Sequence, residues 1–373
     1  MVIDLERRGM DRQLEGLPSE AELDRRATIG HGFTSPELAN LMAHVKLTLK
    51  ADLLAGDLPD DPDFAAVLPE YFPVGVRTRF AEAIPRHRLR REIITTMVVN
   101  DVIDNAGISY PFRLAEQLDS TGADAVRAYS AAVTILELRP LWAELRACPM
   151  PIAARDALEF EVGATLERLA RWLLLSCGHP REISACAAGY RSGLARLTAV
   201  ADQWQPACMR ADTACRAEQS RRTGAPSDLA ERVFGLAHLV PLLDVLDLAE
   251  DCGREPEQVA ALYYSLRHEL RIDRILRTVE ELEHGDRWGA LARLAVRDDL
   301  HDSMRLLSLD VLTSVEPGLD TAATIADWAA RNRSRLTRAE NAFAEILAAP
   351  EPGLETLSVA TRQIRALVLK RGR

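Results

Sequence analysis

Apolar residues recur every three to four positions along most of the chain, which is the spacing of one face of an α-helix. No run of alternating residues is long enough for a useful β-strand, and no repeat of fixed period is present. The pattern predicts an all-α fold of about a dozen helices with no sheet of significance. Glycines 107, 178, 224, 253 and 285 supply helix stops. After residue 79, helices are expected at 86–105, 110–119, 122–137, 151–177, 181–204, 206–221, 227–250, 255–270, 273–284, 286–314, 320–348 and 353–370.

The first strong helix is expected in the segment TSPELANLMAHVKLTLKADLLAG, residues 34–56. Ser35 suits the N-cap and Pro36 suits the first helical position. Glu37 favours the positive end of the helix dipole, and Gly56 ends the helix. The buried stripe of this helix is expected to contain Leu38, Leu41, Met42, Val45, Leu49 and Leu53.

The domain organisation is expected to be simple. Residues 1–33 are interrupted by glycine and proline and predict a lead-in or linker, with one short helix that Ser19 caps and Glu22 closes as a capping box. Residues 34–373 are expected to form the helical domain, which prolines break before residue 79. Subdomain breaks are expected near 148–151 and 224–227, where ACPMP and TGAPS interrupt the helical period.

Composition and charge narrow the class of protein. A chain of 373 residues can bury a large core without a disulfide or a metal. Its formal net charge of −10 argues against a general nucleic-acid binder, which carries a basic excess. The amino terminus has no apolar core of a signal peptide, and RWLLLSC and LAHLVPLLDVLDLA are too short or too interrupted to cross a bilayer. These segments predict no membrane partner. The six cysteines include no C-x-x-C pair, so the spacing of a metal site is absent, and reduced thiols of a cytoplasmic protein are the favoured interpretation.

Polar groups are dense in RFAEAIPRHRLRREIITTMVVNDVIDNAGISYPFRL, residues 79–114. Glu82 with Arg86, and Arg88 with Glu92, are spaced as i,i+4 helix pairs, so part of this charge is expected to be compensated internally. Leu89, Ile93, Ile94, Met97, Val98, Val102 and Ile103 are expected to form the apolar face. Thr96 and Asn100 fall beside or within that face, where a polar side chain normally hydrogen-bonds a neighbouring helix. Structural packing is favoured here over a ligand site.

No nucleotide-binding or nucleophile motif is complete. The single G-x-G, in GHGF at 30–33, has no third glycine at the dinucleotide spacing and no strand before it. Neither a phosphate loop nor a G-x-S-x-G elbow is present. The sequence therefore predicts no nicotinamide or flavin site of Rossmann type in this chain.

Candidate metal ligands are equally incomplete. EELEH, residues 280–284, supplies one E-x-x-H where a di-iron carboxylate bundle needs two such pairs and two further glutamates. DDLHD places Asp298, His301 and Asp302 on one helical face, either as ligands of a divalent ion or, the favoured interpretation, as a solvated face. HEL, residues 268–270, lacks the second histidine of a zinc protease helix. No catalytic, cofactor-binding or metal residue is assigned.

Several long ordered blocks resemble the C-terminal helical region of the large bacterial NAD-specific glutamate dehydrogenases. They are TSPELANLMAHVKLTLKADLLAGDLPDDP, then YFP, then the block at 79–114, and further on DRWGALARLAVRDDLHDSMRLL and LSVATRQIRAL. The resemblance runs over nearly the whole chain and is strongest at 34–114 and 285–307.

The resemblance implies a parent enzyme that converts L-glutamate, NAD and water to 2-oxoglutarate, ammonia and NADH. In that family the catalytic lysine and the nicotinamide-binding fold precede the matching region, so no catalytic residue is carried over and no cofactor is expected in this chain. ERRGMDRQLEGLPSEAELDRR is similar to the connection out of the catalytic domain, which would make Met1 an internal position.

The implied role is structural or regulatory. It would be exercised through contacts with the enzyme's own catalytic domain and with neighbouring subunits of a homo-oligomer. The alternative is a stand-alone helical binding or scaffold protein without enzymatic activity.

Overall fold

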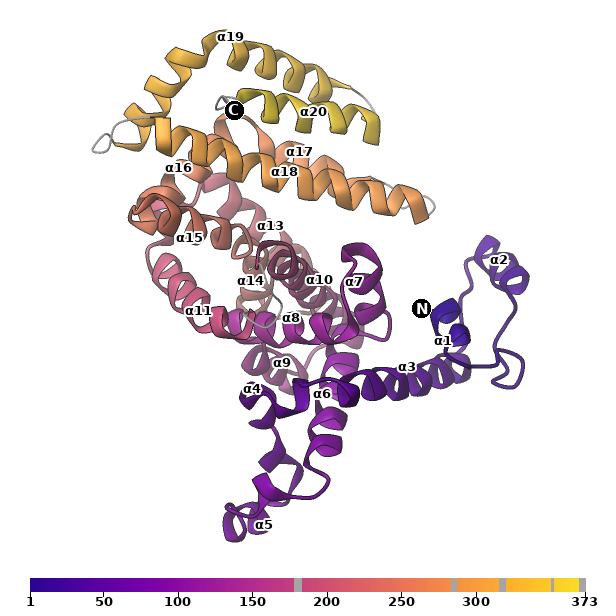
Figure 1. Cartoon of the computed structure of the whole chain (residues 1–373). Coiled ribbons are helices and arrows are strands. Elements are labelled where there is room, and N and C mark those ends of the chain that lie inside the picture. Colours follow the sequence, from indigo (N-terminus) through magenta and orange to yellow (C-terminus); the bar gives the residue numbers. More distant parts are fainter. Residues whose placement is uncertain (178–182, 283–286, 315–319, 350–351, 369–373) are drawn as a thin grey trace. The chain divides into compact units, whose positions relative to one another are not determined.

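The computed structural model describes residues 1–177, 183–282, 287–314, 320–349 and 352–368, and every regular element in these ranges is an α- or 3-10 helix (Figure 1). The all-α prediction is confirmed. Contacts between residues divide the chain into two units. Unit 1 consists of Met1–Ala143 and Glu159–Ala188, and unit 2 consists of Glu144–Leu158 and Gly189–Arg373. The breaks expected near 148–151 and 224–227 stay predictions.

Unit 1 begins with two short helices in the expected lead-in, α1 (Val2–Arg7) and α2 (Glu20–Thr28). Ser19 caps α2 as predicted, because its hydroxyl accepts a hydrogen bond of 3.2 Å from the Glu22 amide. The Glu22 carboxylate pairs instead with Arg25 at 2.8 Å and with Arg26 at 2.9 Å. Only the serine half of the predicted capping box is therefore formed.

Helix α3 (Ser35–Ala55) begins one residue earlier than predicted, because Thr34 rather than Ser35 is its N-cap. The Thr34 amide donates a hydrogen bond of 2.6 Å to the Glu37 carboxylate, which completes a capping box. Leu38 and Met42 were expected in the buried stripe but are exposed. In Figure 1, α6 crosses the C-terminal half of α3. The rest of the predicted stripe is buried, namely Leu41, Val45, Leu49 and Leu53.

Five short elements separate α3 from α6: η1 (Leu58–Asp60), α4 (Pro62–Ala65), η2 (Leu68–Tyr71), α5 (Val74–Arg79) and η3 (Ile84–Arg86). Prolines occupy the first turns of four of them, where the missing amide costs no helical hydrogen bond. Figure 1 shows α5 at the end of a projection that extends beyond α4 and α6. Helix α5 buries no side chain.

Helix α6 (Arg90–Ala106) packs against α3 and supplies much of the core of unit 1. It begins at Arg90 instead of residue 86, because His87 has an extended backbone with ψ of 134°. Leu89 therefore lies outside the helix, exposed rather than in the apolar face. Gly107 ends the helix with φ of 85°, a region that glycine adopts freely. The other expected apolar residues are buried except the half-buried Met97.

Four helices follow: α7 (Tyr110–Leu118), α8 (Gly122–Ile135), α9 (Leu138–Ala147) and α10 (Ile152–Ser176). Thr121 caps α8, because its hydroxyl accepts a hydrogen bond from the Asp124 amide. The predicted helix over 122–137 ends early, since Glu137 adopts a left-handed backbone with φ of 51°. This reversal allows α9 to start at once, and α9 was not predicted.

The next helices are α11 (Ile183–Ala199), α12 (Ala201–Trp204), α13 (Ala207–Arg222), α14 (Ser227–Gly235), η5 (Leu236–His238), α15 (Pro241–Cys252), α16 (Pro256–Glu269) and α17 (Ile272–Glu281). The single helix predicted over 227–250 is wrong, because Pro241 cannot continue a helix and instead starts a new one. The helix predicted over 181–204 is likewise divided, with Val200 as the N-cap of α12.

Three long helices complete unit 2: α18 (Arg287–Ser314), α19 (Thr321–Ala348) and α20 (Leu354–Leu367). Figure 1 shows α20 between α18 and α19, and it packs on both. Helix α19 is kinked at Asn332, whose φ of −110° and ψ of 15° are not helical. Among the described residues, no helix combines the length and apolar character needed to span a membrane.

Candidate functional site

The ion pairs expected within residues 79–92 do not form. Glu82 precedes the 3-10 helix Ile84–Arg86, of which Arg86 is the last residue, and Arg88 precedes α6, so neither pair has the i,i+4 geometry of an α-helix. In the described part of the chain, Glu82, Arg86 and Arg88 take part in no ion pair. The positive charge of this segment is therefore left uncompensated by its nearest acids.

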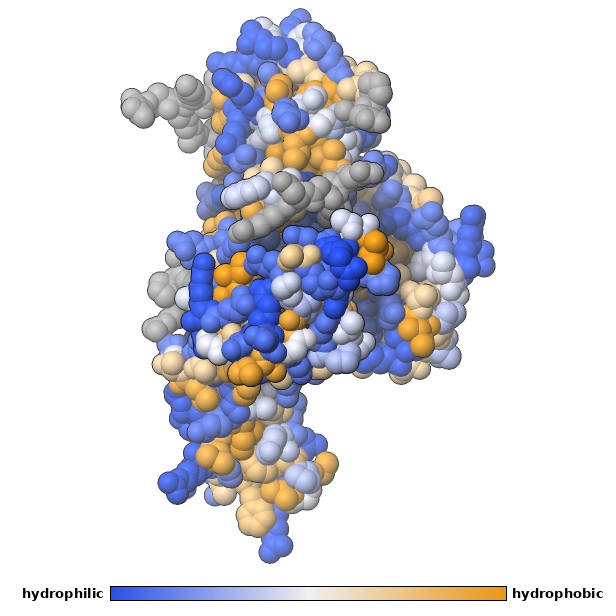
Figure 2. All heavy atoms as spheres, turned by 90° about the vertical axis from the view of Figure 1, so that its right-hand side faces the viewer, coloured by the Kyte–Doolittle hydropathy of each residue, from blue (hydrophilic) through white to orange (hydrophobic). Residues whose placement is uncertain are grey.

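The same segment exposes a group of apolar side chains, and we call residues 68–89 the arm. Tyr71 is 57% exposed, Val74 is 64% exposed and Phe80 is 49% exposed. In Figure 2, apolar residues gather on the lower projection of the molecule. A folded monomer rarely shows such residues together unless the surface serves in binding. The sequence signal was an apolar run broken by Pro69 and Pro73, too short to bury itself, and its exposure was not anticipated.

Arginines surround these apolar groups. Arg77, Arg79, Arg86 and Arg88 are all exposed, and the Arg79 guanidinium lies 5.4 Å from the centre of the Phe80 ring. The arm has a net charge of +2 within a chain of −10. Its chemistry is thus basic and aromatic, unlike the average surface of the protein.

The polar positions of α6 do not join it to a neighbouring helix as expected. The Thr96 hydroxyl donates to the Glu92 carbonyl of its own helix at 2.7 Å. The Asn100 side chain is half-buried and forms no hydrogen bond within the described residues. The prediction that these two side chains fix the packing of α6 on its neighbours is therefore wrong. Thr96 bonds to its own helix, and the Asn100 side chain has no hydrogen-bond partner among the described residues.

Another polar group on α6 makes the link between helices instead. The Tyr129 hydroxyl of α8 donates to the backbone carbonyl of Asp101 at 3.0 Å, and Asn105 donates to the same hydroxyl at 3.2 Å. Arg139 of α9 donates to the Asp101 carboxylate at 3.1 Å. Burial, and then the nearby Asp101 charge, raise the pKa of Tyr129. This phenol therefore stays protonated near neutral pH and acts as a structural donor.

Buried arginines are also committed to structural pairs. In unit 1, Arg127 bridges Asp57 at 3.1 Å and Asp61 at 2.6 Å, which ties α8 to the start of the segment before α4. In unit 2, Arg267 pairs with Asp273 and connects α16 to α17. Such charge-assisted contacts position helices, and none of them brings a nucleophile to a base.

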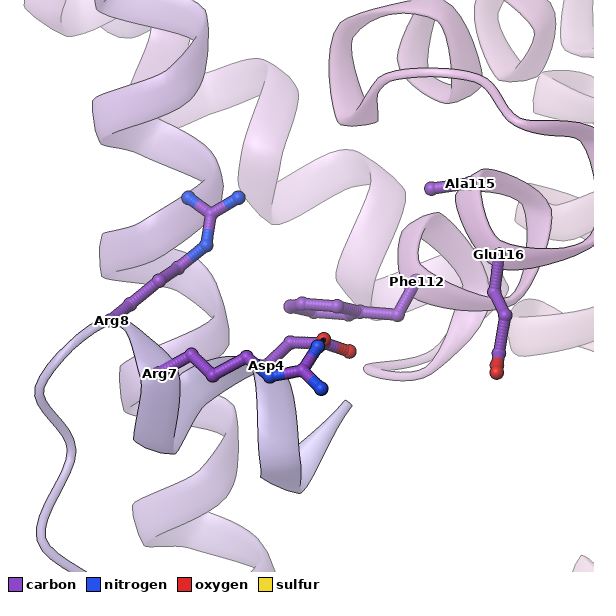
Figure 3. A pocket seen from close by; sticks show the side chains of 6 residues that line it. All are labelled: Asp4, Arg7, Arg8, Phe112, Ala115 and Glu116. Carbon is purple, nitrogen blue, oxygen red and sulfur yellow. Dashed lines mark hydrogen bonds and ion pairs between the residues drawn. The ribbon is translucent and has the colours of Figure 1, made fainter.

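A pocket of about 410 Å³ opens between α1 and α7 of unit 1, as Figure 3 shows. It is lined by Asp4, Arg7, Arg8, Phe112, Ala115 and Glu116. Asp4 pairs with Arg7 at 3.4 Å, and Arg8 pairs with Asp52 at 2.7 Å. Because these charges are balanced by their neighbours, the pocket offers no uncompensated group that would select an ionic ligand.

The candidate metal ligands of the sequence do not assemble into a site. Within the described ranges, no three side chains of His, Cys, Asp or Glu gather closely enough to hold a metal ion. On α18, Asp298 contacts Arg297 at 3.5 Å, and partial burial raises the pKa of Asp302. His284 of the single E-x-x-H lies outside the described residues. The assignment of no site residue stays a prediction.

The glycine pair at 30–33 does not fit a nicotinamide dinucleotide. It lies between two helices, α2 and α3, whereas a dinucleotide turn follows a strand. The Glu37 carboxylate accepts a hydrogen bond from the amide of Thr34, the N-cap of α3, and its pKa is lowered by this bond and by Arg26. A carboxylate at this helix end disfavours a pyrophosphate there, because both are negatively charged.

The described residues form an all-helical structure in which the buried arginine pairs and the Asp101–Tyr129 contact join helices to one another. Residues 30–366 match the family model described as "Glutamate dehydrogenase, C-terminal". The chain belongs to this family, and the family resemblance seen in its sequence blocks is confirmed.

Its relatives are large enzymes. The chain is 42% identical to the NAD-specific glutamate dehydrogenase of Mycobacterium tuberculosis over 366 residues, which is 98% of this chain and 22% of that protein. It is 29% identical to the NAD-specific glutamate dehydrogenase of Pseudomonas aeruginosa, over 98% of this chain and 23% of that protein. The chain therefore spans less than a quarter of the length of these relatives.

Proposed function

We propose that this chain acts as the non-catalytic, C-terminal helical domain of a cytoplasmic NAD-dependent glutamate dehydrogenase. The reaction of the whole enzyme would be the oxidative deamination of L-glutamate to 2-oxoglutarate and ammonia, with NAD as the electron acceptor. The observation that carries this proposal is the family match over residues 30–366. The dinucleotide would bind elsewhere in that enzyme, not to the residues described here.

The structure supports this proposal because its buried polar residues make contacts between helices. The Asp101–Tyr129–Arg139 group and the Arg127 and Arg267 pairs all join helices. Two helical units, one of which carries an exposed arm, suit a role in holding the catalytic domain and neighbouring subunits, or in passing a regulatory signal between them. Homo-oligomeric partners are part of this proposal.

The test is a domain exchange in the Mycobacterium tuberculosis relative. Its segment that matches this chain is replaced by residues 1–373, and a second variant lacks the segment altogether. The exchanged enzyme is expected to assemble and to retain glutamate-dependent reduction of NAD, whereas the deletion is expected to lose assembly. An exchanged enzyme that assembles fully but lacks activity would contradict a purely supporting role.

A further inference from the structure

We propose that the arm, residues 68–89, docks onto the exposed acidic face of α10 in a second copy of this chain. This proposal deepens the supporting role proposed above, because it names one surface pair through which copies associate. It does not depend on the reaction of the whole enzyme. The surface that the arm would contact, the face of α10, belongs to the same chain.

The arm has the composition of an interface anchor. Tyr71 and Phe80 are large, exposed aromatic groups, and aromatic and arginine side chains dominate the binding energy of protein interfaces. Four exposed arginines lie within twelve positions of one another, from Arg77 to Arg88. Within the described residues none of the four forms an ion pair, so their charge is available to an acidic surface.

One face of α10 has the complementary composition. Ile152 is 73% exposed and Phe160 is 75% exposed, and Asp156 stands between them on the same face at spacings of four residues. Glu159 shares this face, because each residue turns an α-helix by about 100°. Asp156 and Glu159 have no ion-pair partner among the described residues. These four positions belong to one unbroken helix, so their common face follows from the helix alone.

Charge complementarity selects a second copy as the occupant. The arm carries +2, whereas the whole chain carries −10, so the surface outside the arm is strongly acidic. Phe80 and Phe160 are both largely exposed in one chain, which shows that they do not cover each other within it. In a dimer with two-fold symmetry this contact would form twice, once from each arm. Because the contact joins opposite charges, association of the two copies should weaken steeply as the salt concentration rises.

The experiment is sedimentation equilibrium on the full chain and on charge-reversal variants. Arg77→Glu with Arg79→Glu alters the arm, and Arg333→Glu with Arg335→Glu is the matched control on exposed arginines of α19 with the same spacing. We expect the wild-type chain to self-associate at about 0.1 M salt and much less at about 1 M. The arm variant is expected to weaken association by about tenfold or more, and the control by less than about twofold.

A rescue variant distinguishes docking from misfolding. Asp156→Arg with Glu159→Arg should weaken association alone, and it should restore association when mixed with the arm variant, since the charges are then exchanged. Unchanged thermal melting would show that both variants fold. A wild-type chain that stays monomeric, or an arm variant that associates like the wild type, overturns the proposal.

Binding of the wild-type chain to a labelled single-stranded oligonucleotide, lost in the arm variant, would assign the arm to nucleic acid and would also overturn it. A monomeric chain that still supports an active exchanged enzyme would refute the docking alone and leave the proposed function intact. An inactive, fully assembled exchanged enzyme would refute the proposed function alone.

Discussion

The indole nitrogen of Trp328 in α19 donates a hydrogen bond of 3.1 Å to the carboxylate of Asp310 in α18, and both side chains are buried. A buried carboxylate is costly unless a donor satisfies it. This bond joins two of the three long helices at the end of unit 2, near the kink at Asn332, whose amide donates to the Trp328 carbonyl at 3.0 Å. The contact therefore holds α18 and α19 together at a point where α19 is locally irregular.

Trp328→Phe should destabilise the chain by about 3 kcal/mol, because it removes the donor to Asp310 and also reduces packing. The free energy of unfolding, measured by urea denaturation, checks this value. Asp310→Asn keeps an acceptor oxygen for the indole and serves as the control, with a smaller expected loss. A Trp328→Phe variant as stable as the wild type would show that the hydrogen bond contributes nothing.

Arg127 is expected to matter for the stability of unit 1. Arg127→Ala should lower the free energy of unfolding by about 2 kcal/mol, since it leaves the partly buried Asp61 without its ion-pair partner. Arg127→Lys restores a charge but not the planar fork that reaches Asp57 and Asp61 together, so it should recover only part of the loss. Full recovery by lysine would contradict the importance of the fork.

Asp247 should make stability dependent on pH. Burial raises the pKa of Asp247 above its ordinary value, although the Tyr190 hydroxyl donates to it at 2.8 Å and opposes the shift. A carboxyl group whose pKa is higher in the folded state destabilises that state once it ionises, so its contribution falls as pH rises through the folded pKa.

Asp247→Asn should therefore melt at a higher temperature than the wild type near neutral pH, and the difference should shrink in acid, where Asp247 is protonated. Thermal melting across this pH range provides the measurement. Tyr190→Phe is a suitable control, because removing the donor should raise the pKa of Asp247 further and increase the destabilisation at neutral pH. A difference that does not vary with pH would exclude a titration of Asp247.

Asn100 offers a test of the corrected interpretation of α6. Asn100→Leu should leave stability unchanged or raise it by about 1 kcal/mol, because the half-buried amide has no hydrogen-bond partner among the described residues and leucine adds apolar contact. Equilibrium denaturation checks the result. A loss of more than about 1 kcal/mol would indicate that Asn100 has a structural partner.

The helical period predicted the all-α class and the core of α6, since Ile93, Ile94, Val98, Val102 and Ile103 recur with the spacing of one buried face. Local capping chemistry was also predictable, as Ser19 shows. These features are determined by residues a few positions apart in the sequence, so a periodic pattern is enough to predict them.

The features that the sequence did not predict depend on the backbone conformation of single residues or on contacts between residues distant in the sequence. The left-handed Glu137 separates α8 from α9, and a non-glycine residue rarely signals such a reversal. The i,i+4 spacing of Glu82 and Arg86 predicted a pair that required a continuous helix, and the 3-10 turn at Ile84–Arg86 removed it. The sequence pattern therefore did not predict the exposed arm, because the expected pairs would have compensated part of its charge.

On the proposed function, this chain supports a glutamate dehydrogenase without carrying out its chemistry. The most direct measurement is glutamate-dependent reduction of NAD by the purified 373-residue chain, together with calorimetric titration of NAD into the same sample. We predict no turnover and no heat of NAD binding, while the exchanged full-length enzyme is active. Clear turnover or saturable NAD binding by the chain alone would contradict the claim.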